Sequence, residues 1–190
     1  CWAAWAGNVL QAFEAFQVLC AVRKGPWGVE GLNERITRAL FARKLIDSDQ
    51  HWYEGRPVLM TRNDYGLGLM NGDIGLTVAD EQGQLRVIFA QAGQVRWISP
   101  LRLPDVDTVF AMTVHKSQGS EFDHAALILP DHPGPLLTRE LVYTAITRAK
   151  TRFTLLEAKV GLLELAAQTV TRRESGLGDA LLARQGAQTL

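Results

Sequence analysis

A run of polar and small residues follows an apolar stretch at residues 109–114. These residues are His-Lys-Ser-Gln-Gly-Ser-Glu, from His115 to Glu121. A buried strand would deliver them beyond its carboxyl end, where open α/β sheets bind ligands. The segment is therefore a candidate ligand-binding loop. A solvated loop explains the same composition about as well, so the composition alone does not decide between the two.

A second candidate is an arginine on a helix predicted over residues 138–149. The apolar stripe of this helix consists of Val142, Ala145, Ile146 and Ala149. Thr144 and Arg148, four residues apart, share the opposite face. We therefore expect the helix to present Arg148 outward, where its planar guanidinium can bind phosphate oxygens. The alternative is a surface arginine whose stem covers apolar area.

The sequence has no phosphate-binding loop of the P-loop type. Such a loop needs a Gly-Lys pair, and no lysine in the chain follows a glycine. Asp80-Glu81, after an apolar run, imitates a magnesium-binding acidic pair. The Gln82-Gly83 pair that follows favours a hairpin turn instead. The cysteines Cys1 and Cys20 and the four histidines show no metal-ligand spacing, so we expect no metal site.

The hydrophobic periodicity of the sequence changes along the chain, and it predicts the elements that would position these residues. Residues 2–16 form a predicted amphipathic helix with a buried aromatic stripe, followed by a strand at 18–22 and a helix that carries Val29, Leu32, Ile36 and Leu40. Between residues 55 and 103, four short predicted strands are separated by glycine turns. They indicate a small antiparallel barrel inserted into the chain.

Alternation of strands and helices returns after Pro104. Predicted strands at 109–114, 125–129 and 153–156, with the helix at 138–149, are typical of an α/β fold with a parallel sheet. Arginines and glycines from Arg172 to Gly178 suggest a loosely packed tail.

Composition excludes several classes of protein. The 190 residues carry 20 Lys plus Arg against 20 Asp plus Glu, and 47% are hydrophobic, as in ordinary globular proteins. No apolar run approaches the roughly 20 residues that span a bilayer. No signal segment opens the chain, so we expect a cytoplasmic protein without membrane contact. The neutral balance makes any contact with DNA local.

Two segments together resemble a known family. Residues 111–123, A-M-T-V-H-K-S-Q-G-S-E-F-D, and 141–150, L-V-Y-T-A-I-T-R-A-K, resemble motifs V and VI of superfamily-one DNA helicases. R-K-G-P-W-G-V-E-G-L-N at 23–33, Y-E-G-R-P-V at 53–58 and L-M-N-G-D-I-G at 69–75 are similar to the RecD family, the alpha subunits of exodeoxyribonuclease V. The resemblance covers nearly the whole chain.

The resemblance implies an architecture. In that family ATP lies between two RecA-like domains of the P-loop NTPase type, and the first supplies the phosphate loop and the Mg²⁺ ligands. This chain matches the second domain, which is interrupted by an SH3-like barrel and supplies motifs IV to VI. Residues 1–54 and 104–172 would form that domain, 55–103 the barrel and 173–190 a tail. The chain would then be a C-terminal fragment that is inactive in isolation.

The resemblance also implies roles for single residues. Arg148 would be the arginine finger that reaches the γ-phosphate of ATP across the cleft. The other expected ATP contacts are Arg23, Gly119 and Glu121. The expected contacts to single-stranded DNA are Thr113, His115 and Gln118, with Asn33, Arg62 and Asn63 as weaker candidates. Tyr143 and Thr144 would hold the motif VI helix at the cleft.

The implied function is a subunit of an ATP-dependent 5′–3′ DNA helicase that acts in double-strand-break repair and recombination. Its implied partners are single-stranded DNA and RecB-like and RecC-like subunits. One alternative is a noncatalytic module that binds single-stranded DNA or a protein through the barrel. Another is part of a stand-alone helicase of the same family. The barrel could guide DNA or be a structural insertion, because its arginines are nearly balanced by acidic residues.

Overall fold

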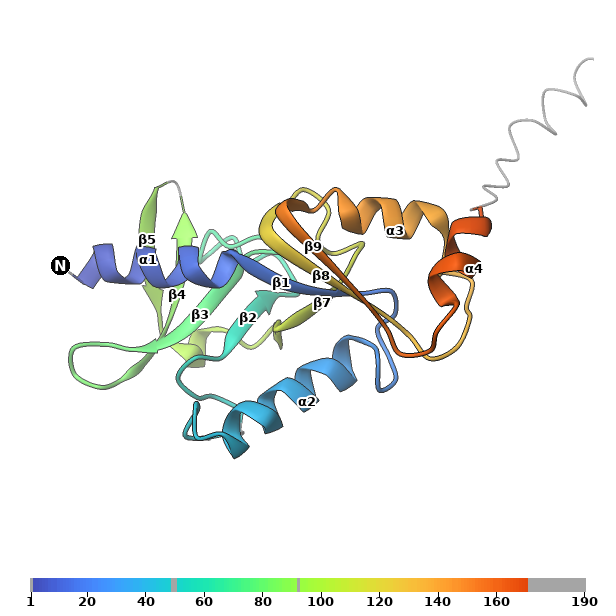
Figure 1. Cartoon of the computed structure of the whole chain (residues 1–190). Helices are drawn as coiled ribbons and strands as arrows, with labels where there is room; N and C mark the ends of the chain where they lie inside the picture. The colour runs from blue at the N-terminus through green and yellow to red at the C-terminus, as the bar shows by residue number, and fades with distance from the viewer. Residues whose placement is uncertain (1, 49–50, 92, 171–190) are drawn as a thin grey trace, which may run out of the picture.

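The computed structural model describes residues 2–48, 51–91 and 93–170. Cys1 and the expected tail at 173–190 lie outside these residues. The described residues form two β-sheets, and the chain passes from the first sheet into the second and back (Figure 1).

The first sheet is parallel throughout and has the strand order β7-β1-β8-β9. Its strands are β1 (Phe16–Cys20), β7 (Ala111–Thr113), β8 (Phe122–Leu129) and β9 (Ala149–Glu157). The apolar runs at 18–22, 109–114, 125–129 and 153–156 each contain part of a strand, as short buried runs in parallel sheets do. The prediction of an α/β fold with a parallel sheet is confirmed.

The second sheet is antiparallel and lies between α2 (Val29–Ala42) and β7 in the chain. It has the order β5-β4-β3-β2-β6. The strands are β2 (Pro57–Met60), β3 (Ile74–Ala79), β4 (Leu85–Gln91), β5 (Gln94–Ile98) and β6 (Val106–Thr108), with the short 3-10 helix η1 (Pro100–Arg102) before β6. We call residues 57–108 the antiparallel unit. It extends past the expected end at residue 103, because β6 pairs with β2. Its SH3-like character stays a prediction.

The expected hairpin after β3 is present. One carboxylate oxygen of Asp80 accepts hydrogen bonds from the backbone N–H groups of Gln82 at 3.0 Å and Gln84 at 2.8 Å. Gly83 has a φ of +73°, which glycine adopts without steric cost. The other carboxylate oxygen accepts from Arg86 Nε at 2.9 Å, so the acidic pair belongs to a turn.

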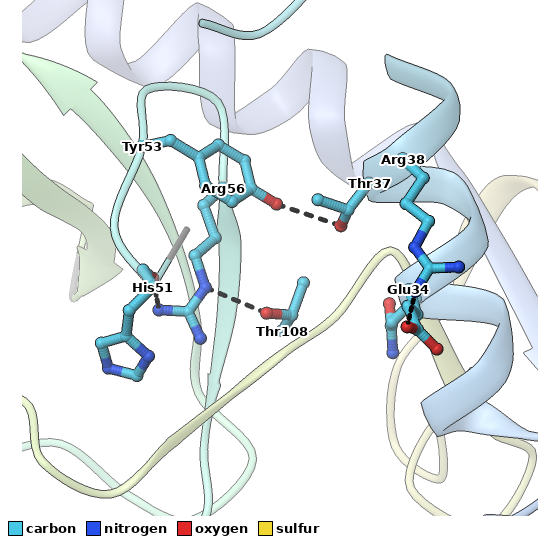
Figure 2. A pocket seen from close by; sticks show the side chains of 8 residues that line it. Glu34, Thr37, Arg38, His51, Tyr53, Arg56 and Thr108 are labelled. Atoms are coloured by element: carbon cyan, nitrogen blue, oxygen red, sulfur yellow. Dashed lines mark hydrogen bonds and ion pairs between the residues drawn. The ribbon is translucent and has the colours of Figure 1, made fainter. Parts of the chain in front are cut away.

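The two ends of the antiparallel unit meet beside α2. Arg56 lies just before β2 and Thr108 ends β6, and Arg56 Nε donates to Thr108 Oγ1 at 2.9 Å (Figure 2). Tyr53 is buried, and its hydroxyl lies 3.2 Å from the hydroxyl of Thr37 on α2. These contacts fix the point where the chain leaves the parallel sheet and returns to it.

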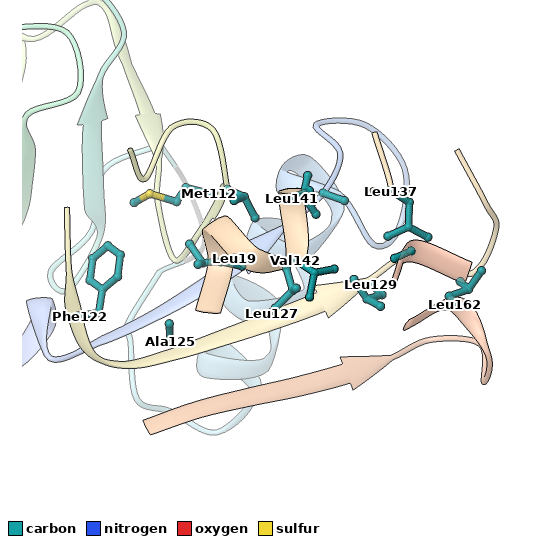
Figure 3. Close-up of a cluster of buried hydrophobic side chains, with 14 of the residues drawn as sticks. Leu19, Met112, Phe122, Ala125, Leu127, Leu129, Leu137, Leu141, Val142 and Leu162 are labelled. Atoms are coloured by element: carbon teal, nitrogen blue, oxygen red, sulfur yellow. The ribbon is translucent and has the colours of Figure 1, made fainter. Parts of the chain in front are cut away.

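Helices cover both faces of the parallel sheet (Figure 1). Alternate residues of a strand point to opposite faces. On one face Cys20 packs with Leu32 of α2 (Val29–Ala42) and with Ala111. On the other face Leu19 belongs to the largest apolar cluster, which also contains residues of α3 (Arg139–Ile146) and α4 (Leu162–Gln168) (Figure 3).

The first helix differs from its prediction. In α1 (Trp2–Glu14) the buried residues are Ala6 and Leu10, whereas Trp2 and Trp5 are 42% and 41% exposed. Phe16 lies outside the helix, because it pairs with His124 as the first residue of β1. The face of α1 that carries Ala6 and Leu10 packs on Leu76, Val78 and Ile88 of the antiparallel unit. Helix α1 therefore covers the antiparallel unit. We had expected this helix in the first part of the motor domain, residues 1–54.

Candidate functional site

The polar segment after β7 folds back over the parallel sheet as a turn. Ser117 is buried, and its hydroxyl donates to the carbonyl of Val114 at 2.8 Å. Its backbone N–H donates to the carbonyl of Thr113 at 3.2 Å. Gly119 follows with a φ of +89°, a conformation that favours glycine. The turn carries the chain from the carboxyl end of β7 toward the amino end of β8.

This segment lies against α3. A cavity of about 450 Å³ is lined by His115 and Gln118 on one side and by Thr138, Glu140 and Thr144 on the other. The N-cap Thr138 accepts a hydrogen bond from the backbone N–H of Leu141 at 3.3 Å and so starts the helix.

The remaining motif VI residues have different exposures. The Thr144 hydroxyl donates to the carbonyl of Glu140 at 2.7 Å, one turn earlier. Tyr143 is 67% exposed and lies on the solvent side of α3. Tyr143 is therefore available to a neighbouring domain, whereas Thr144 is tied to its own helix.

Arg148 is not on the helix, contrary to the prediction. Helix α3 ends at Ile146, with Thr147 as its C-cap, and Ile146 is 46% exposed. The expected helix to residue 149 is shorter because Ala149 pairs with Phe122 as the start of β9. Sheet pairing thus replaces the last helical turn, and Arg148 lies in the tight connection between α3 and β9.

The guanidinium of Arg148 is held against the preceding motif. Its Nη1 donates to the carbonyl of Ser120 at 3.0 Å, and its Nε donates to the carbonyl of Thr144 at 3.3 Å. Nη2 lies 3.3 Å from the Thr147 hydroxyl. The backbone N–H of Phe122 donates to the Arg148 carbonyl at 2.8 Å. Arg148 therefore lies next to Gly119 and Glu121, and its side chain is partly exposed.

Arg148 keeps donors for a ligand. A guanidinium has five N–H groups, and three of those of Arg148 are used in these bonds. One N–H group remains on each terminal nitrogen. The other three N–H groups are anchored to backbone and hydroxyl oxygens. The guanidinium therefore presents its two remaining N–H groups from a fixed position.

Arg23 is separated from this group. It follows β1 and so lies beyond the carboxyl ends of the strands, whereas Arg148 precedes the amino end of β9. Phe122 pairs with Ala149 and Ile128 pairs with Cys20. At about 3.3 Å of rise per residue, these two levels of the sheet are roughly 20 Å apart. Arg23 and Arg148 therefore lie at opposite ends of the sheet, which argues against the expected contact of Arg23 with ATP.

The surroundings of Arg23 place it beside a different part of the site. It forms exposed ion pairs with Glu30 at 3.6 Å and Asp107 at 3.4 Å. With Thr113 and Lys116 it lines a cavity of about 160 Å³. Two cations and the Thr113 hydroxyl thus gather at the carboxyl ends of β1 and β7, where open α/β sheets bind ligands.

Lys116 is a residue to which the sequence assigned no role. Its ammonium donates to the side-chain oxygen of Asn71 in the antiparallel unit at 3.0 Å. Asn71 donates its backbone N–H to the side-chain oxygen of Asn63 at 2.8 Å. Nothing in the spacing of residues 63, 71 and 116 indicated this connection, because it joins two separate sheets.

The side-chain amide of Asn33 forms hydrogen bonds within the fold. It is 8% exposed, and its amide exchanges two hydrogen bonds with the backbone of Ala111, at 3.0 Å and 2.9 Å. An amide engaged in this way anchors β7 to α2 and is not presented to DNA. The other weak DNA candidates are exposed: Arg62 lies 4.0 Å from Asp105, and Asn63 lies on the loop between β2 and β3.

The described residues contain no group of three or more His, Cys, Asp or Glu side chains that could hold a metal ion. Within that same part of the chain, no helix has the length and apolar character needed to cross a membrane.

Comparisons with known proteins show which families this chain resembles. Residues 108–156 match the UvrD-like helicase C-terminal domain. The RecD subunit of the RecBCD enzyme of Mycolicibacterium smegmatis is 46% identical over 145 residues, which are 76% of this chain and 26% of that protein. The ATP-dependent RecD2 DNA helicase of Deinococcus radiodurans is 36% identical over 144 residues, 73% of this chain and 19% of that protein.

A solved structure of the Bacteroides Pif1 helicase with ADP-AlF3 and single-stranded DNA is 14% identical, with a TM-score of 0.48. The alignment covers 93% of this chain and 46% of that one. The chain spans about a quarter of the length of the RecD subunits of Mycolicibacterium smegmatis, Haemophilus influenzae and Mycobacterium tuberculosis.

Proposed function

This chain belongs to the RecD-type helicase family, and we propose from that premise that it forms the C-terminal half of the motor of an ATP-dependent DNA helicase. The proposal rests chiefly on Arg148, whose guanidinium lies 3.0 Å from the Ser120 carbonyl between Gly119 and Glu121. A cation fixed beside a glycine turn and a carboxylate is suited to a nucleotide that another domain holds.

In the proposed reaction, Arg148 acts on the γ-phosphate. Its two remaining N–H groups donate to phosphate oxygens as negative charge develops there during hydrolysis. An arginine in this role contributes roughly 10³ to 10⁵ in rate in related nucleotide hydrolases. Gly119 gives the nucleotide room, and the exposed carboxylate of Glu121 accepts a hydrogen bond from the ribose. Tyr143 contacts the domain across the cleft, and Thr144 stabilises the helix behind it.

ATP and Mg²⁺ would be held mainly by a domain outside this chain. The sequence has no Gly-Lys pair for a phosphate loop, and the described residues offer no cluster of metal-binding side chains. The chain contributes the finger and the ribose contact to a composite site, and the isolated chain does not hydrolyse ATP.

Single-stranded DNA is proposed to bind along the turn after β7. Thr113 and His115 contact the strand, and Gln118 couples this contact to the nucleotide side, since it lines the same cavity as Thr144. Arg23 joins the DNA contacts here, because it lies with Thr113 and Lys116. Arg62 and Asn63 extend the contact along the antiparallel unit. Movement is proposed in the 5′–3′ direction, in double-strand-break repair and recombination.

Arg148→Ala in the full-length helicase tests the proposal. We expect ATP turnover to fall by about 10³-fold or more while ATP still binds, because the finger acts on the transition state. Steady-state ATPase assays and nucleotide binding measure the two effects. Arg152→Ala, in an exposed position on β9, is the matched control. Turnover within a few fold of the unmodified enzyme would reject the finger role.

The partners are proposed to be RecB-like and RecC-like subunits. The alternative within the same family is a stand-alone helicase, because the Deinococcus relative is a RecD2 helicase. Co-purification of the full-length protein with RecB-like and RecC-like chains from the same genome distinguishes them: a stoichiometric complex supports the first, and an active monomer supports the second.

A further inference from the structure

A polar cavity of about 470 Å³ lies where α2 meets the segment that leads into the antiparallel unit. Figure 2 shows Glu34, Thr37 and Arg38 of α2 on one side and His51 and Arg56 on the other. Motifs V and VI contribute no residue to its lining. The cavity is therefore separate from the nucleotide and DNA contacts proposed above.

Arg56 is a buried cation that forms no ion pair with a carboxylate of the described residues. It is 5% exposed, and none of the ion pairs among the described residues involves it. Its contacts are neutral: the Thr108 hydroxyl at 2.9 Å, the His51 carbonyl at 2.6 Å and the Trp52 ring, whose centroid lies 4.7 Å away. Buried charges in proteins are usually paired, so this one is unusual.

The charge of Arg56 persists despite its burial. Burial lowers the pKa of the guanidinium, and the nearby Tyr53 and Asp107 act in the opposite direction. Arginine does not lose its proton in proteins. Two of its five N–H groups are used within the fold. The remaining donors and the positive charge of Arg56 therefore border the cavity.

The opposite wall adds a second cation on a basic segment. Arg38 forms an ion pair with Glu34, and its side chain is still 71% exposed. Residues 23–47 contain six basic and three acidic side chains, in a chain that is neutral overall. Glu34 weakens the positive field at the cavity but does not cancel two guanidinium groups.

We propose that this cavity binds a phosphate group, with Arg56 and Arg38 as its charged donors. Guanidinium forks match the oxygens of a phosphate in planar, paired hydrogen bonds. Inorganic phosphate, a free nucleotide and the backbone of DNA share this chemistry. The inference does not depend on the proposed helicase function, because the binding can be measured without ATP turnover.

Titration of the 190-residue chain with inorganic phosphate tests the proposal. NMR of the arginine side chains reports directly on Arg56, because its Nε–H is held by Thr108. We expect its resonance to shift in a saturable way with phosphate and not with chloride at equal ionic strength. A shift that chloride reproduces, or one that never saturates, would overturn the proposal.

Variants on α2 provide the controls without disturbing the buried arginine. Arg38→Ala should weaken phosphate binding about tenfold, as the loss of one charge-assisted hydrogen bond does. Arg35→Ala removes the same charge from the same helix, but Arg35 lies over Trp27 at 4.7 Å and not at the cavity, so binding should stay within about twofold. Equal losses in both variants would show nonspecific attraction and reject the site.

A gain of affinity is also expected. Glu34→Gln removes the carboxylate that competes for Arg38, so phosphate should bind several-fold more tightly; unchanged or weaker binding contradicts the assignment.

Competition with a mononucleotide and with a single-stranded oligonucleotide then identifies the source of the phosphate group. Displacement of phosphate by the oligonucleotide at lower concentration assigns the cavity to the DNA backbone, and displacement by the mononucleotide alone assigns it to a free ligand.

Discussion

Arg23 shows how the position of a single residue in the sheet limits its chemistry. Its sequence context suggested an ATP contact, but it lies at the carboxyl ends of the strands with Thr113 and Lys116. Arg148 lies at the amino end of β9, beside Ser120. Their positions at opposite ends of the sheet argue against a shared phosphate.

Arg23→Ala in the full-length helicase should therefore weaken binding of single-stranded DNA and leave ATP binding unchanged. Removing one phosphate contact should lower the slope of log K against log salt by about one. Fluorescence anisotropy over a salt series measures this slope. A raised Kd for ATP with an unaltered slope would return Arg23 to the nucleotide side.

Asn33 is a residue whose effect should be on stability. Asn33→Ala leaves the backbone N–H and carbonyl of Ala111 without their partners in a buried place. We expect a loss of about 2 to 4 kcal/mol in the free energy of unfolding. Chemical denaturation measures it, and Asn63→Ala, which is exposed, should change stability by less than about 0.5 kcal/mol. Similar small effects in both variants would show that the Asn33 amide is not needed to hold β7.

At the scale of elements, the start of α2 depends on close approach of two backbones. A Cβ atom at Gly31 would lie 2.5 Å from the carbonyl oxygen of Gly25 and 2.8 Å from the Cα of Pro26. Both are backbone atoms, so no side-chain rotation relieves the contact. The glycines of the R-K-G-P-W-G-V-E-G-L-N segment thus let the turn after β1 pack against the helix.

Gly31→Ala should destabilise the fold by about 1 to 3 kcal/mol, as overpacking does. Gly7→Ala is the matched control, because Gly7 lies in α1 and nothing approaches its position within 4 Å. That change should stabilise the chain by about 0.5 to 1 kcal/mol, since alanine favours helix more than glycine. Thermal denaturation distinguishes opposite signs, and a stabilising Gly31→Ala would contradict the close approach.

At the scale of the molecule, Cys20 reports on the integrity of the parallel sheet. Its side chain is fully buried, and burial raises the pKa of the thiol from 9.0 to about 12. Only the thiolate reacts readily. In a Cys1→Ser variant, alkylation of Cys20 should therefore require global unfolding and should follow the loss of circular dichroism. Labelling in native buffer at the rate of the unfolded chain would contradict this burial.

The same shift gives a pH dependence. Because the folded pKa of Cys20 lies above the unfolded value, the folded state holds a proton that the unfolded chain has lost between pH 9 and about pH 12. The contribution to stability is thus complete below pH 9 and is lost as the pH rises toward 12. Denaturation midpoints should fall over this range, and fall less in a Cys20→Ala variant.

The packing of α1 also matters at this scale. Because Ala6 and Leu10 cover Leu76, Val78 and Ile88, residues 55–103 alone would expose an apolar surface. A test of DNA binding by the antiparallel unit therefore needs α1 as well. The Lys116–Asn71 hydrogen bond joins the unit to the turn after β7.

The order of residue types along the chain was enough to determine the parallel sheet, the antiparallel insertion and the absence of a Gly-Lys pair. These features depend on local periodicity and spacing, which a sequence records directly. The tertiary structure alone decided where α3 ends, what Asn33 bonds to, which end of the sheet holds Arg23 and what α1 covers. Each of these depends on competition between distant segments: strand pairing at Ala149 outweighs one more helical turn, and register across β1, β7, β8 and β9 sets distances that no spacing in the chain contains.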